Sequence, residues 1–119
     1  MTSGQAEGSA ASDVGRLVAQ TADAAELHAP VPTLLMELQT LLGTLCAAVA
    51  NTTHRGRKPF RPDDEWPRRL GDLGYGMYLL ADQTGVDLAS AISATANNVG
   101  ARTTPTPSAD PDAWPFEAH

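Results

Sequence analysis

The residues best suited to chemistry form a basic cluster in the second half of the chain. Six of the eight Lys and Arg residues fall within fifteen positions: Arg55, Arg57, Lys58, Arg61, Arg68 and Arg69. Guanidinium groups can bind phosphate or carboxylate oxygens without a metal ion. The neighbouring Asp63, Asp64 and Glu65 could instead neutralise the cluster, and the sequence favours this second interpretation because charge runs are usually solvated surface.

Other reactive residue types are scattered. His28, His54 and His119 fall in three different segments, which gives no metal-binding constellation. The single cysteine, Cys46, excludes an intrachain disulfide, and we expect it to be a buried, inert thiol within an apolar helix.

Composition bounds the class of protein. The 119 residues carry a net charge of −6, which argues against a nucleic-acid polymer as partner. We find neither a signal peptide nor a long apolar run, so we expect a cytoplasmic protein with no membrane partner. Seven Arg against one Lys suggests a GC-rich bacterial genome.

The folding segment is small for a self-sufficient core, so a homo-oligomer is expected.

The elements that must position these residues are helices. Residues 1–12 and the Pro-rich residues 103–119 are predicted to be disordered tails. Between them, residues 13–102 predict an all-α domain of four helices. The first starts at a cap on Ser12 or Asp13 and stops at the HAPVP segment, and the second covers 34–50 after a cap on Thr33. The third follows a cap on Asp64 and stops at Gly85, and the fourth follows Asp87.

Two glycines interrupt the third predicted helix. Gly71 and Gly74 lower its helix propensity, so we expect them to admit a neighbouring backbone. Tyr75 and Tyr78 in the same helix are expected to pack between helices rather than stack on a base.

The stretch RRLGDLGYGMYLLADQTGVDLASAI, together with HAPVPTLLMELQTLLGTL, resembles the MazG-like all-α nucleotide pyrophosphohydrolases. The resemblance covers residues 28–102 and rests on helix order more than on single residues. It implies a four-helix MazG-like bundle and a Mg²⁺-dependent hydrolysis of nucleoside triphosphates to monophosphates and pyrophosphate. It also implies metal-binding carboxylates at Leu41, Thr44, Arg69 and Asp72, of which only Asp72 is present.

A residual site remains an alternative. Glu37 lies one turn before Leu41 on the same helical face, so Glu37 and Asp72 could hold one Mg²⁺ that keeps several waters. Two isolated carboxylates on packed helices are more often surface residues, and this interpretation is favoured. Near the end of the last helix, Asn97 and Asn98 resemble polar residues with which the family contacts its nucleotide.

These observations predict a MazG-like protein with a degenerate Mg²⁺ site that binds a nucleotide or another anion, as an oligomeric or regulatory module. The candidate phosphate-binding residues are Arg57, Lys58, Arg68, Arg69, Asn97 and Asn98. A divergent but active pyrophosphohydrolase is the first alternative. The second is a protein-interaction module that docks through Trp114 and Phe116 of the tail.

Overall fold

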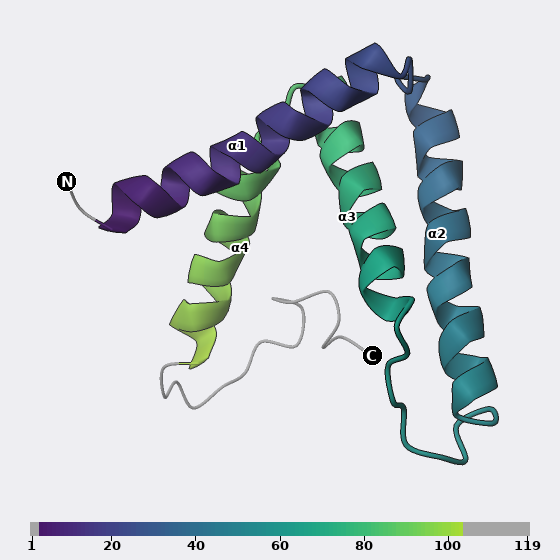
Figure 1. The fold of residues 1–119 in the computed structure, drawn as a ribbon. Helices are drawn as coiled ribbons and strands as arrows, with labels where there is room; N and C mark the ends of the chain where they lie inside the picture. Colours follow the sequence, from purple (N-terminus) through teal and green to yellow (C-terminus); the bar gives the residue numbers. More distant parts are fainter. Residues whose placement is uncertain (1–2, 104–119) are drawn as a thin grey trace. The chain divides into compact units, whose positions relative to one another are not determined.

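The computed structural model describes residues 3–103, with side chains from residue 13 onward, and every regular element in that range is an α-helix (Figure 1). The helices are α1 (Ser3–Ala24), α2 (Val31–Thr52), α3 (Trp66–Gln83) and α4 (Leu88–Thr103). The predicted all-α class is confirmed. The chain divides into two compact units, Met1–Leu88 and Ala89–His119, and each is described by itself.

Helix α1 differs from its prediction at both ends. It begins at Ser3, so the boundary expected at residue 12 is not where the helix starts. Ala, Gln and Glu in that segment have high helix propensity, which offsets its Gly and Ser. The helix ends before the HAPVP segment, because Glu26 takes a left-handed conformation (φ 57°) and the Leu27 N–H donates to the Ala22 carbonyl at 2.9 Å.

Helices α2 and α3 lie side by side and run antiparallel (Figure 1). Helix α2 starts three residues before the predicted Leu34, because its first turn accommodates Pro32. Helix α3 has Pro67 in its first turn, as predicted. It stops before Gly85, whose φ of 72° lets the Val86 N–H donate to the Ala81 carbonyl at 2.8 Å, which confirms the predicted end.

The core of the first unit lies where α1, α2 and α3 meet. Its centre joins two side chains of α1 with one each from α2 and α3: Val18, Ala22, Leu34 and Leu79. Tyr75 and Tyr78 pack against this cluster, which confirms their predicted packing role. The Tyr75 hydroxyl also lies 2.6 Å from that of Thr21, so the ring keeps a polar partner while its face is covered.

Two predictions about packing are wrong. Cys46 is exposed rather than buried, because α3 covers a different face of α2. At Gly71 and Gly74 an added Cβ would meet nothing within 4 Å, so neither admits a neighbouring chain segment among the described residues. Gly76 does so instead, since a Cβ there would lie 2.8 Å from Leu38 Cδ2.

By length and composition alone, α2 could cross a membrane, contrary to our expectation from the apolar runs of the sequence. The core helix of a soluble protein passes the same test, so one such helix is weak evidence.

Candidate functional site

A pocket of about 400 Å³ lies between the C-terminal half of α2 and the first turns of α3. From α2 it is lined by Leu41, Thr44, Ala47, Ala48 and Asn51, and from α3 by Arg68, Arg69 and Asp72. We call it the α2–α3 pocket. It combines an apolar floor with two guanidinium groups, one carboxylate and two uncharged polar side chains.

The α2–α3 pocket gathers all four positions at which the resemblance expects metal-binding carboxylates. These positions hold Leu41, Thr44, Arg69 and Asp72, so one carboxylate and one guanidinium group stand among them. Residues from two helices, 28 positions apart between Thr44 and Asp72, therefore line one hollow, and three of the four are not carboxylates.

Arg68 lies between two carboxylates. Its Nε donates to Glu65 Oε2 at 2.6 Å, and its Nη1 lies 3.4 Å from Asp72 Oδ2. The hydrogen bond and charge of Glu65, with a smaller contribution from Asp72, raise the pKa of the Arg68 guanidinium above its ordinary value. Arg68 therefore stays charged and occupies one side of the only carboxylate in the pocket.

Arg69 is the more covered of the two arginines, with 27% of its side chain exposed. Its Nη1 lies 3.3 Å from Asp63 Oδ1, in the segment just before α3. The predicted neutralisation of the basic cluster by its acidic neighbours is thus confirmed for Arg68 and Arg69. The Arg68–Glu65 and Arg69–Asp63 pairs are both partly or fully exposed, so each contributes little to the stability of the fold. Another anion can therefore replace the carboxylate at little cost.

This donor set does not fit Mg²⁺. Over the described part of the chain, no group of three or more His, Cys, Asp or Glu side chains could hold a metal ion. Thr44 donates its hydroxyl to the Leu41 carbonyl at 2.6 Å, and Asp72 already faces Arg68. A divalent cation beside Asp72 would meet two guanidinium groups and a single carboxylate.

Of the remaining candidate residues, those in the first unit do not line this pocket. Glu37 is exposed on α2 and is not among the residues that line the pocket, so a Mg²⁺ held by Glu37 and Asp72 stays a prediction. Arg57 and Lys58 are exposed in the loop between α2 and α3. Asn97 and Asn98 are exposed on α4, in the second unit.

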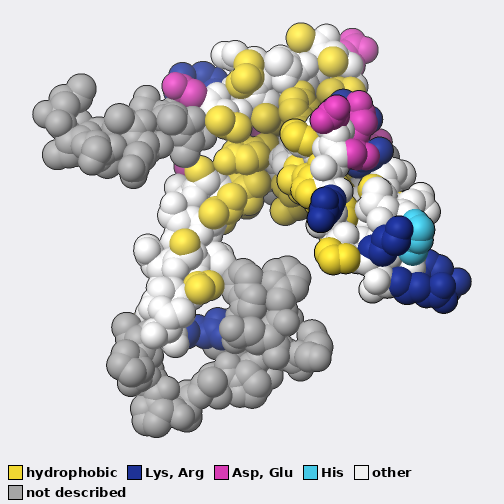
Figure 2. All heavy atoms as spheres, turned by 60° about the horizontal axis from the view of Figure 1, so that its bottom comes forward, with side chains coloured by type: hydrophobic (Ala, Val, Ile, Leu, Met, Phe, Trp, Pro, Cys, Tyr) yellow, Lys and Arg dark blue, Asp and Glu magenta, His cyan; other side chains and the backbone are white. Residues whose placement is uncertain are grey.

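Charged side chains of both signs lie close together on the surface. Figure 2 shows dark blue basic groups beside magenta acidic groups, next to a broad area of yellow hydrophobic side chains. Some basic groups thus lie beside acidic ones, as in the ion pairs of Arg68 and Arg69, whereas others gather beside the cyan histidine with no acidic group next to them in this view.

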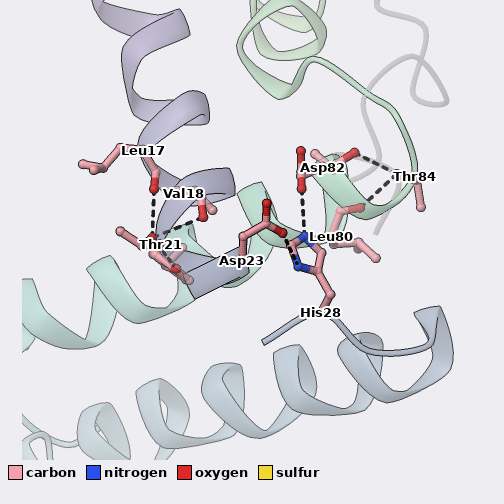
Figure 3. Close-up of polar contacts among 10 residues, drawn as sticks. Leu17, Val18, Thr21, Asp23, His28, Leu80, Asp82 and Thr84 are labelled. Atoms are coloured by element: carbon pink, nitrogen blue, oxygen red, sulfur yellow. Dashed lines mark hydrogen bonds and ion pairs between the residues drawn. The ribbon is translucent and has the colours of Figure 1, made fainter. Parts of the chain in front are cut away.

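A second polar cluster, absent from the sequence prediction, joins the ends of α1 and α3 (Figure 3). His28 places Nε2 at 2.9 Å from Asp82 Oδ2 and Nδ1 at 3.3 Å from Asp23 Oδ1. Both ring nitrogens of His28 thus have a carboxylate partner, and the cluster links the end of α1 to the end of α3. The signal in the sequence was a polar pair, His28 and Asp82, at two helix ends, but only the fold shows that these ends meet.

No family model, curated protein or solved structure matches this chain.

Proposed function

We propose that this chain is a MazG-like protein with a degenerate Mg²⁺ site, which binds a nucleotide or another polyphosphate anion and acts in binding or regulation rather than in efficient hydrolysis. The observation that supports this proposal is the α2–α3 pocket, where Leu41, Thr44 and Arg69 stand at three positions for which the resemblance implies carboxylates, and where Arg68 adds a second guanidinium group. The site has changed from one that attracts cations to one that attracts anions.

The chemistry of the two arginines favours phosphate. Each guanidinium has five N–H donors, and Arg69 uses one of its terminal nitrogens, in a contact as long as 3.3 Å. A phosphate can take the place of Asp63 and Glu65, because exposed ion pairs exchange at little cost. Asn51 supplies a further polar group on the facing helix.

The same geometry opposes hydrolysis. Phosphoryl transfer is catalysed mainly by charge stabilisation of the transition state, which metal ions provide in most enzymes of this class. With one carboxylate that already faces Arg68, the pocket has no ligand set that would hold such an ion.

Binding of inorganic pyrophosphate and of ATP, measured calorimetrically without divalent cations, tests the proposal. Arg69→Gln should weaken binding by about ten-fold or more, since one charge-assisted hydrogen bond contributes about 1.5–3 kcal/mol. Arg16→Gln is the control, because Arg16 forms an ion pair of similar length with Asp13, at 3.1 Å, outside the pocket and on a more exposed part of the surface. Equal losses in both variants, or no binding by the wild type, would refute a phosphate site at Arg69.

A divergent hydrolase is the second candidate, and Asp72 is the observation in its favour, because the one expected carboxylate does line the pocket. Pyrophosphate release from a panel of (d)NTPs with Mg²⁺ or Mn²⁺, compared with Asp72→Ala, separates the two. Metal-dependent turnover that disappears in the variant would replace the binding proposal by a hydrolase. Docking through Trp114 and Phe116 concerns residues outside the described range, and deletion of residues 103–119 tests it.

A further inference from the structure

Helix α2 carries a second apolar face that α3 does not cover. Alternate steps of four and three residues connect Leu35, Gln39, Leu42, Cys46 and Val49, so these side chains form one stripe along the helix. We call it the α2 stripe. Leu35 is 48% exposed and Leu42 is 51% exposed, whereas Leu34, which packs in the core with Leu79 of α3, is buried. The α2 stripe contains no charged residue.

The two ends of this face differ in shape. Near the N-terminal end of α2, the side chain of Leu35 projects from the stripe. Near the C-terminal end lies an apolar hollow of about 560 Å³. It is lined by Leu45, Cys46, Val49, Ala50, Thr53, Arg55 and Gly56. A leucine side chain therefore projects at one end, and a shallow, open apolar hollow lies at the other.

We propose that the α2 stripe is the contact surface for a second copy of this chain, in an antiparallel two-fold pair of α2 helices. With the axis between Leu42 and Cys46, Leu35 of each copy faces the hollow of the other. A two-fold contact uses the same patch on both copies, so Leu35 of the first copy meets the hollow of the second, and Leu35 of the second meets the hollow of the first. The absence of charge on the stripe means that the pairing sets no like charges against each other.

The remainder of the chain gives a reason for such a partner. Only six hydrophobic residues of the described part are buried: Val18, Ala22, Leu34, Leu45, Leu79 and Ala81. A domain of this size buries little surface alone, and a second copy would enlarge its core. The 22 residues of α2 span about 33 Å, so the pairing is short and should dissociate on dilution.

A lipid bilayer is the other environment that suits an apolar helix, but it fits this structure less well. The opposite side of α2 carries Thr44 and Asn51 and adjoins Arg68, Arg69 and Asp72 in the α2–α3 pocket. Burial of those charges in hydrocarbon would be costly. Only one face of α2 needs an apolar partner, and a second α2 stripe supplies a surface of that width.

The molar mass in solution, measured by sedimentation over a range of protein concentrations, tests the proposal. The wild type should form dimers at high concentration, and Leu42→Glu should remain monomeric because two carboxylates would meet near the axis. Leu70→Glu on α3 is the matched control, since Leu70 is 46% exposed and lies off the stripe. A monomeric wild type at every concentration, or dimers lost equally in both variants, would overturn the proposal.

Two further measurements keep this test decisive. Circular dichroism must show that Leu42→Glu keeps its helices, which its half-exposed position allows; if it unfolds, Leu35→Glu is used instead. A short thiol-to-thiol cross-linker should give covalent dimers of the wild type, because Cys46 is the single cysteine and lies beside the axis. A monomer that instead sediments with anionic phospholipid vesicles through Leu42 would replace the second copy by a membrane surface.

This surface is independent of the proposed anion site. Leu41, Thr44 and Ala48 line the α2–α3 pocket from a different side of α2, so a paired α2 stripe leaves the pocket open. Leu42→Glu should abolish dimers and keep pyrophosphate binding, whereas Arg69→Gln should do the reverse. Failure of one proposal is therefore distinguishable from failure of the other.

Discussion

At the scale of single residues, two helix ends share one backbone pattern with different side chains. Glu26 after α1 and Gly85 after α3 both have positive φ, and in each case the next N–H donates to a carbonyl five residues earlier. A left-handed conformation costs a non-glycine residue about 1–2 kcal/mol. We therefore expect Gly85→Ala to lower the free energy of unfolding by about 1 kcal/mol, as measured by urea denaturation.

Glu26→Gly is the reciprocal change at the matching position. It should stabilise the chain by a fraction of the same amount, because glycine relieves strain but also gains freedom in the unfolded state. Destabilisation by both substitutions would contradict the backbone explanation. The sequence predicted the end at Gly85, since glycine is the usual residue there, and missed Glu26, since nothing in a glutamate side chain indicates this conformation.

At the scale of elements, the glycines of α3 differ in whether an added side chain would meet a neighbouring helix. Space is open around Gly71 and Gly74, whereas a Cβ at Gly76 would lie 2.8 Å from Leu38 and 3.5 Å from Leu41 on α2. We expect Gly71→Ala to stabilise α3 by about 0.5–1 kcal/mol, the usual gain of alanine over glycine in a helix interior. Gly76→Ala should show less gain or a loss, because Leu38 must move.

Thermal and urea unfolding of the two variants measure this difference directly. A loss at Gly71→Ala as large as at Gly76→Ala would mean that another helix covers Gly71 in solution.

The same comparison shows what a sequence can predict about elements. Four helices and the end of α3 followed from apolar periodicity, proline and glycine, which are local properties. The sequence could not tell which of three α3 glycines meets α2, or that Cys46 is exposed, because both depend on the rotation of one helix against another. The ion pairs of Arg68 with Glu65 and of Arg69 with Asp63 were predictable, because these residues are close in sequence, whereas the pocket that α2 and α3 form around them depends on how the two helices pack.

At the scale of the whole molecule, α2 has two faces that make different contacts. One side packs on α3 and contributes Leu41 and Thr44 to the α2–α3 pocket, and another exposes the α2 stripe. The net charge of −6 would repel a polyphosphate at long range, so any anion binding must come from the local arginines, and added salt should screen both effects.

If two chains pair through the α2 stripe, the thermal stability of the fold depends on the protein concentration. Anything that binds only the folded state raises the unfolding temperature in proportion to the logarithm of its concentration, and here that ligand is the chain itself. The thermal midpoint of the wild type should therefore rise by several degrees between low and high micromolar protein, because 1 kcal/mol shifts a domain of this size by about 4–8 °C. The midpoint of Leu42→Glu should not depend on concentration, and that of Leu70→Glu should follow the wild type. Identical concentration dependence in all three proteins would place the association elsewhere, whereas a flat wild-type midpoint would mean that the first unit is stable on its small core alone.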